Sequence, residues 1–273
     1  MTNNRHLVKV VLISFTLLVS LLFGLPSTGK ELKEKEESRP AMQVPIVLYH
    51  RFGSEAADSM TVRTSIFESQ VKYLMENGYT VIPLRQLVDY RLGRKNGLPS
   101  QSVVITVDDG HKSVYTDMFP ILRKYRIAAT LFLYPSAISN APYAMTWDQL
   151  REIKSSGLVD FQSHTLWHPN FKKDRGRLTP VDYENFVEMQ FKKSKERLEK
   201  ELDTKVDMLA WPFGIYDDDL IHKAIETGYV AAFTMERHHS NISDRVMALP
   251  RFLITNDTGE KGFGRLLVGP RCS

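Results

Sequence analysis

The feature that most constrains the fold of this chain is an apolar, largely β-branched run at 103–107 that ends in Asp108, Asp109 and Gly110. Such a run is typical of a strand buried on both faces, as in a parallel sheet covered by helices. Neighbouring strand residues point to opposite faces, but where the chain turns at the strand's end both side chains can meet at one site. The simpler alternative is an Asp-Gly turn that leaves the core. We therefore expect either such a turn or an acidic pair that serves a site.

Strand and helix signals alternate along the rest of the chain. The expected strands are 44–50, 79–82, 103–107, 128–134, 158–163, 208–211, 229–233 and 248–254. The expected helices are 65–77, 84–92, 118–125, 147–156, 180–202 and 217–227. This alternation favours parallel βαβ units, and the length of the chain favours a closed barrel over an open sheet. We therefore predict an α/β fold of the TIM-barrel kind, in which chemistry gathers at the carboxyl ends of the strands.

Two further expected strands end in histidines: His50 follows the first, and His164 and His168 follow the one at 158–163. One carboxylate and two imidazoles match a catalytic zinc-type site, with three protein ligands and an open position. A second carboxylate that is not a ligand can then act as a general base. Each histidine could instead be an ordinary core or surface residue. The acidic pair at another strand end favours the metal site, with Asp108 and Asp109 divided between base and ligand.

These motifs resemble those of the polysaccharide deacetylases with the NodB homology domain, carbohydrate esterase family 4. The family's first motif, T-F-D-D-G, is matched by 106–110, and its second, H-[ST]-x-x-H, by 164–168. The resemblance covers 44–254 and implies a distorted (β/α) barrel of about seven strands with one divalent metal ion. By position it makes Asp108 the general base. The ligands it implies are Asp109, His164 and His168. This donor set suits Zn, Co, Ni or Fe about equally well.

The family's third motif, R-x-P-[FY]-G, is matched only in part, at 210–214. The backbone N–H of Phe213 keeps its place as an oxyanion donor beside the metal. Ala210 stands where the family has the arginine that orients the base. Arg251, at another expected strand, is the candidate replacement for that arginine.

The family's last motif, L-x-H, is missing from the C-terminal region but occurs at 48–50, on the first expected strand. Closing a barrel makes the first and last strands neighbours. A circularly permuted order therefore puts His50 where the resemblance places the general acid.

This arrangement is similar to the subgroup that deacetylates poly-β-1,6-N-acetylglucosamine in biofilm matrices. The resemblance implies a hydrolase that removes N-acetyl groups from an extracellular polysaccharide and releases acetate. The aromatic residues expected to bind sugar are Trp167, Tyr134 and Trp211. The alternatives are a deacetylase of peptidoglycan or chitin-like β-1,4 chains, a non-catalytic cell-surface polysaccharide-binding protein, and a metalloamidase for small amides. The intact set of base and ligands favours the enzyme.

The first residues indicate export. Arg5 and Lys9 precede an uncharged apolar run at 10–25, and polar residues follow. This pattern predicts a signal peptide at 1–29, or an N-terminal membrane anchor, since the run approaches the roughly 18–20 residues that span a bilayer. A charged linker at 30–43 and a catalytic domain at 44–273 complete the expected organisation. We expect an exported, extracellular or cell-surface protein that contacts the membrane if the segment is uncleaved.

Composition excludes some functions. The net charge of +4 is too small to indicate nucleic-acid binding. The single cysteine, Cys272, cannot form an internal disulfide. We expect a monomer whose stability comes from its core. The run at 217–219 is expected to cap a helix, the pair at 238–239 to lie on the surface, and the glycine-rich stretch 259–264 to be disordered.

Overall fold

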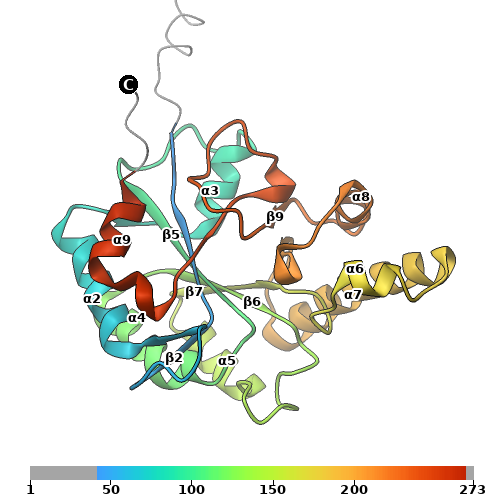
Figure 1. The fold of residues 1–273 in the computed structure, drawn as a ribbon, viewed down its shortest axis with the longest axis horizontal. Coiled ribbons are helices and arrows are strands. Elements are labelled where there is room, and N and C mark those ends of the chain that lie inside the picture. The colour runs from blue at the N-terminus through green and yellow to red at the C-terminus, as the bar shows by residue number, and fades with distance from the viewer. Residues whose placement is uncertain (1–41, 269–273) are drawn as a thin grey trace, which may run out of the picture. The chain divides into compact units, whose positions relative to one another are not determined.

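A curled sheet of parallel strands forms the centre of the computed structural model, which describes residues 42–268 (Figure 1). The strands run in the order β10-β1-β5-β6-β7-β8-β9, with β4 beside β5. Their bounds are β1 (Ile46–Tyr49), β4 (Thr80–Val81), β5 (Ser102–Asp108), β6 (Ala129–Leu133), β7 (Val159–Ser163), β8 (Met208–Ala210), β9 (Ala231–Phe233) and β10 (Phe252–Leu253). The predicted export segment, most of the linker and Cys272 lie outside the described residues.

The segment 249–253 joins the two ends of this sheet. Leu249 forms a parallel bridge with Phe233 of β9, and β10 pairs in parallel with β1. The first and last strands are therefore neighbours, as the placement of His50 required. The predicted distorted (β/α) barrel is confirmed, with seven strands along the main path of the sheet.

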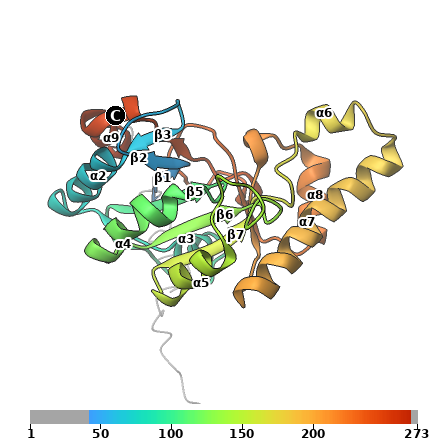
Figure 2. The same cartoon turned by 90° about the horizontal axis from the view of Figure 1, so that it is seen from below.

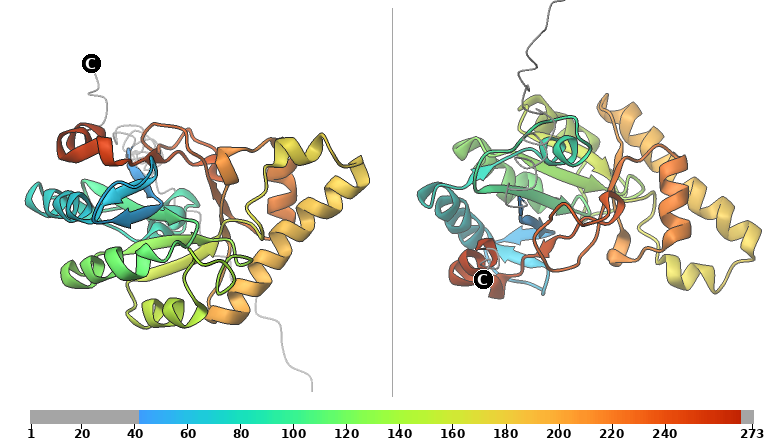
Figure 3. Two further views of the ribbon diagram at one scale, coloured as in Figure 1. Left: turned by 60° about the horizontal axis from the view of Figure 1, so that its bottom comes forward. Right: turned by 90° about the horizontal axis from the view of Figure 1, so that it is seen from above.

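Helices surround the sheet (Figure 2). Their bounds are α2 (Thr64–Glu76), α3 (Leu84–Arg91), α4 (Phe119–Tyr125), α5 (Trp147–Ser155), α6 (Phe171–Arg175), α7 (Pro180–Leu202), α8 (Asp218–Glu226) and α9 (Gly259–Leu267). The sequence sets several of their starts. Thr179 caps α7 with Pro180 in its first turn, and the side chain of Asp217 accepts from Leu220 N at the start of α8, as predicted. Helices α6, α7 and α8 group at one end of the domain (yellow to orange in Figure 3), where α7 packs against α6, α8 and β7.

The interior face of β5 ends at a residue of the predicted site. Along β5, Val104, Thr106 and Asp108 share one face, since side chains alternate on a strand. Val104 packs in an apolar cluster with Phe132 of the neighbouring β6 and Phe233 of β9. The opposite face of β5 joins the larger core beneath the helices. Asp108 is thus the charged residue at the carboxyl end of an otherwise uncharged interior row. Within residues 42–268, no helix is both long and apolar enough to cross a membrane.

Three local predictions were incomplete or wrong. A small parallel sheet of β2 (Arg51–Gly53) and β3 (Thr61–Arg63) was not predicted, and neither was α6. The stretch 259–264, expected to be disordered, begins α9. Its helix forms despite its glycines because Phe263 is fully buried and Gly264 receives Tyr73, whose hydroxyl oxygen would lie 2.6 Å from an added Cβ.

The histidine pair at 238–239 was expected on the surface, and only half of it lies there. His238 is exposed and pairs with Asp244. His239 is buried, and its Nε2 donates to Leu266 O of α9 at 2.7 Å. The buried histidine therefore helps to hold α9 in place.

Candidate active site

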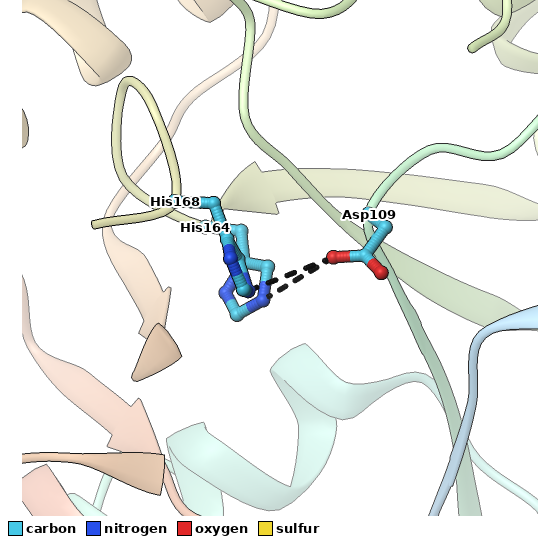
Figure 4. Close-up of side chains that lie close together, drawn as sticks. All are labelled: Asp109, His164 and His168. Atoms are coloured by element: carbon cyan, nitrogen blue, oxygen red, sulfur yellow. Dashed lines mark ion pairs between the residues drawn. The ribbon is translucent and has the colours of Figure 1, made fainter. Parts of the chain in front are cut away.

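Side chains of Asp109, His164 and His168 converge at the carboxyl edge of the sheet (Figure 4). One ligand atom from each residue lies within 4.8 Å of the other two. Asp109 Oδ1 is 3.7 Å from Nε2 of both imidazoles. Donors about 2.1 Å from one ion in tetrahedral geometry stand about 3.4 Å apart, so the observed spacing fits a shared divalent cation. The three residues therefore fit the metal that the sequence predicted, and oxygen with nitrogen donors is a set that several transition metals accept.

The protonation of His164 also fits a ligand. Its Nδ1 lies 2.8 Å from the carbonyl oxygen of Ala210 and donates to it, which leaves Nε2 free to face Asp109. Burial lowers the pKa of His164 to about 3, and burial lowers the pKa of His168 as well. Both imidazoles are therefore neutral near pH 7, the form that binds metals.

Several residues at the site have left-handed backbone: Asp109 (φ 76°), Thr165 (φ 66°), His168 (φ 58°) and Phe213 (φ 57°). Left-handed backbone is costly for residues other than glycine, and especially for a β-branched one, so it persists only where the surroundings enforce it. The described residues include four more non-glycine residues with this backbone at other positions. Two of the four at the site, Asp109 and His168, are members of the ligand cluster.

Asp108 is held by Arg251, and its Oδ2 lies 3.7 Å from Nε2 of His164. Arg251 Nη1 and Nη2 donate to the two carboxylate oxygens at 2.8 and 2.7 Å, and Nε donates to Thr234 O at 3.0 Å. Both partners are buried. Burial alone would raise the pKa of Asp108, but the charge of Arg251 outweighs it and the pKa falls to about 2. Arg251 thus lies where a substitute for the missing motif arginine was expected, and it keeps the carboxylate ionised.

His50 follows β1, the neighbour of β5 in the sheet. The residue is buried, and its Nδ1 has no hydrogen-bond partner among the described residues. Burial lowers the pKa of His50, while the charges of Asp108 and Asp109 act in the opposite direction. A lowered pKa makes the imidazolium of His50 a stronger acid, and it also leaves the imidazole mostly neutral near pH 7.

Aromatic side chains lie beside the metal-ligand cluster. The Phe213 ring is 56% exposed and its centroid is 4.6 Å from that of His168. Tyr134 lies 5.4 Å from the same imidazole on another side, and its hydroxyl is 2.7 Å from that of Tyr143. Trp167, one residue before His168, is 54% exposed. Phe213 and Tyr134 thus pack beside His168, while the ring of Trp167 lies 6.1 Å from that of Phe186 on α7.

Trp211 does not lie among these residues. Its side chain is fully buried and its indole N–H donates to Met247 O at 2.9 Å. The sugar-binding role expected for Trp211 does not fit this burial, because the ring packs into the core between Phe191 and Tyr216.

Sequence reasoning missed one contribution to the site. The carbonyl of Ala210 orients His164, although the residue had been noted only for the arginine it replaces. A backbone carbonyl leaves no signal in a sequence. Tyr143 also contacts residues near the cluster: its hydroxyl pairs with that of Tyr134, and its ring stacks on His111 at 6.3 Å between centroids.

A parallel barrel with an Asp-His-His cluster beside an arginine-held carboxylate defines a class of α/β proteins with a metal-binding site at the carboxyl edge of the sheet. The family model for polysaccharide deacetylase matches residues 95–232, so the chain belongs to the polysaccharide deacetylase family.

Known relatives agree with this assignment. The chain is 27% identical to the poly-beta-1,6-N-acetyl-D-glucosamine N-deacetylase of Escherichia coli (strain K12), over 96% of this chain and 44% of that protein. It therefore spans less than half the length of that relative. It is 26% identical to the protein of the same name from Staphylococcus aureus (strain MSSA476), over 95% of this chain and 96% of that one. The Streptococcus pyogenes deacetylase PplD, solved in complex with acetate, shares the fold at TM-score 0.75 and 21% identity, over 84% of this chain and all of that one.

Proposed function

We propose that this chain is a metal-dependent hydrolase that removes N-acetyl groups from N-acetylglucosamine units of poly-β-1,6-N-acetylglucosamine. The observation that carries the proposal is the convergence of an Asp-His-His cluster with a separate carboxylate, Asp108, whose two oxygens are held by Arg251. The names of the curated relatives support the choice of polymer.

Asp109, His164 and His168 would hold the metal. A divalent ion bound there supplies Lewis acidity, which lowers the pKa of water and polarises a carbonyl oxygen. We propose that this ion is Zn, Co, Ni or Fe.

Asp108 would act as the general base. Its carboxylate stays ionised because Arg251 pairs with it, so it is always in the form that accepts a proton. The bidentate contact also fixes its orientation, which a general base needs at its reacting proton. The low pKa limits its basicity, and proximity to the reacting water compensates for this. When water adds to the acetyl carbonyl carbon, Asp108 takes the proton that the water loses.

Phe213 and His50 would complete the reaction. Phe213 itself has left-handed backbone, and its ring packs against His168. Its N–H would stabilise the developing negative charge on the former carbonyl oxygen. The carbon–nitrogen bond then breaks, His50 supplies a proton to the departing amine, and acetate and glucosamine remain. The exposed rings of Trp167 and Phe213, with Tyr134, would hold the sugar, since aromatic faces pack against apolar faces of small ligands.

The test is release of amine from poly-β-1,6-N-acetylglucosamine oligomers by the full chain, before and after chelation and after return of a divalent ion. We expect activity that disappears with the chelator and returns with the ion. Parallel assays on peptidoglycan and on β-1,4 chitin oligomers compare the alternative polymers. Binding of a polymer without any release of amine would instead favour a non-catalytic polysaccharide-binding protein.

We also propose that the protein acts outside the cytoplasm, as a monomer. The support is the predicted export segment at 1–29 and the extracellular location of the proposed substrate. Fractionation of producing cells, with mass determination of the mature chain, would show whether that segment is removed or retained as an anchor.

A further inference from the structure

The loop 164–168, which carries two of the three proposed metal ligands, depends on a side chain from α7. Two of its N–H groups, those of Leu166 and Trp167, donate to one atom, Gln190 Oε1, at 3.2 and 3.0 Å. Gln190 is fully buried and lies in the middle of α7. The loop is thus tied to a helix well separated from it in the sequence.

The other three N–H groups of the loop donate to acceptors outside α7. His164 N donates to Leu133 O of the neighbouring strand, Thr165 N to Ser163 Oγ, and His168 N to Thr165 Oγ1. The hydroxyl of Ser163 in turn lies 2.8 Å from that of Ser194, one turn further along α7. Helix α7 therefore contacts the ligand strand and loop through two buried polar side chains.

The loop needs such support because its conformation is unfavourable. Thr165 and His168 both have left-handed backbone, and for the β-branched Thr165 this is a genuine outlier. The turn brings Nε2 of His164 and Nε2 of His168 to the same distance from Asp109 Oδ1. A loop that relaxed from this conformation would separate the two imidazoles.

Gln190 also lowers the stability of the fold in one respect, because it buries an unpaired donor. Its Nε2 is buried and has no hydrogen-bond partner among the described residues. A buried, unsatisfied donor is destabilising, whereas an apolar side chain of similar size would not carry it. The benefit lies with the acceptor Oε1, and within residues 42–268 that atom accepts only from the ligand loop.

We propose that Gln190 is a positioning residue that holds the metal-ligand loop in its binding geometry, so that its acceptor oxygen sets the affinity of the site for metal. The inference rests on the proposed metal site. It makes no use of substrate, so metal binding alone can test it.

The structure offers a matched control in Gln162 of β7. This residue is also fully buried, and its Oε1 likewise accepts from two consecutive backbone N–H groups, those of Asp207 and Met208, at 3.0 and 2.9 Å. Those groups lie at the amino end of β8, at the opposite edge of the barrel from the site. Gln162 lies on β7 two residues before His164, but among the described residues its side chain hydrogen-bonds only Asp160, Lys205, Asp207 and Met208, so its replacement removes the same kind of contact without removing a hydrogen bond to the ligand loop.

The experiment is titration of the full 273-residue chain with Co²⁺, followed by the visible absorption of the bound ion. We expect Gln190→Met to weaken Co²⁺ binding by about tenfold or more and to change the spectrum, as loss of ligand support commonly does. Gln162→Met should lower the stability of the chain but leave the Co²⁺ affinity and spectrum unchanged. Gln190→Glu keeps an acceptor oxygen and should restore most of the affinity.

Equal loss of affinity in Gln190→Met and Gln162→Met would overturn the inference, because it would reflect general destabilisation. Native affinity in Gln190→Met would also overturn it. No Co²⁺ binding by the unaltered chain would contradict the metal site itself, and the inference with it. If Gln190→Met does not fold, Gln190→Leu removes the same acceptor oxygen with another apolar side chain. We expect weaker Co²⁺ binding in that variant, and unchanged binding would contradict the inference.

Discussion

Two buried aspartates stand at opposite edges of the same barrel, and each is paired with an arginine. Asp108 ends β5 at the carboxyl edge and is held by Arg251, which is fully buried. Asp207 precedes β8 at the amino edge and is held by Arg85, which remains 30% exposed, and by Lys205 at 2.8 Å. The two pairs look alike as contacts, but their surroundings differ.

The polar groups around Asp207 at the amino edge are paired, although Thr130 Oγ1, near the start of β6, is buried without a partner among the described residues. Gln162 uses both its oxygen and its nitrogen there, accepting from two N–H groups and donating to Asp160 and to Lys205 O. The carboxyl edge carries unpaired groups: His50 Nδ1 and Gln190 Nε2 are buried without partners among the described residues.

This difference separates stability from chemistry within one sheet. In barrels of this kind the amino edge serves stability and the carboxyl edge serves catalysis. Unpaired groups and strained backbone at the carboxyl edge cost stability, and such costs are typical of functional sites. Changes at the carboxyl edge should therefore lower turnover, and changes at the amino edge should lower stability without lowering turnover.

The largest effect on turnover that leaves stability intact is expected from His50→Gln. Loss of the proposed proton donor should lower kcat by about 10²–10⁴-fold. The free energy of unfolding should change by no more than about 1 kcal/mol, since the lost Nδ1 has no partner. Amine release and urea unfolding of the same preparation measure both. Native turnover would remove His50 from the proposed mechanism.

Arg251→Met should affect both properties. Asp108 would become a buried carboxylate without its partner, which costs about 3–5 kcal/mol of stability. Turnover should fall about 10²-fold because the base loses its orientation. Urea unfolding and amine release under conditions where the variant is folded test the two effects. A variant as stable as the native chain would show that the pair is not a buried ion pair in solution.

Asp207→Asn should lower stability and leave turnover unchanged, the reverse of what we expect for His50→Gln. The variant should lose about 2 kcal/mol of stability, less than for a fully buried pair because Arg85 and Lys205 reach solvent. Turnover per folded chain should be unchanged, since this edge lies away from the site. A fall in turnover at full folding would break the proposed division between the two edges.

The smallest expected effect is on the pH dependence of stability. Burial would raise the pKa of Asp207, but its contacts with Arg85 and Lys205 outweigh this and lower it. A lowered folded-state pKa means that the stabilisation is complete above the unfolded value of about 3.9 and is lost as the pH falls below it. The difference in unfolding free energy between native and Asp207→Asn chains should therefore shrink between pH 5 and about pH 3. A constant difference over that range would contradict the assignment.

The same contrast explains what the sequence could predict. Asp109 and His164 follow buried strands directly, and His168 lies in the short loop after the second of them, so their residue types and the βαβ pattern were enough to bring them to one edge. Arg251 could be proposed because Ala210 stands in place of the motif arginine and Arg251 lies at another expected strand.

Other parts of the molecule depend on contacts that local patterns do not contain. Helix α9 forms because Tyr73 packs against Gly264, and helix propensity alone would not favour that stretch. Trp211 looked like a sugar-binding aromatic by its place in a motif, but the fold turns it into the core. Gln190 acts on a loop from the middle of a helix that is amphipathic like many others. Such residues become visible only when the tertiary arrangement is known.

The central claim is that the two adjacent aspartates have different roles, Asp109 as metal ligand and Asp108 as base. The most direct test is to measure Co²⁺ binding and amine release from poly-β-1,6-N-acetylglucosamine oligomers for Asp108→Asn and Asp109→Asn side by side. We predict that Asp108→Asn binds one Co²⁺ per chain but releases no amine, and that Asp109→Asn fails to bind the ion. Loss of Co²⁺ binding in both variants, or full activity in Asp108→Asn, would contradict the account.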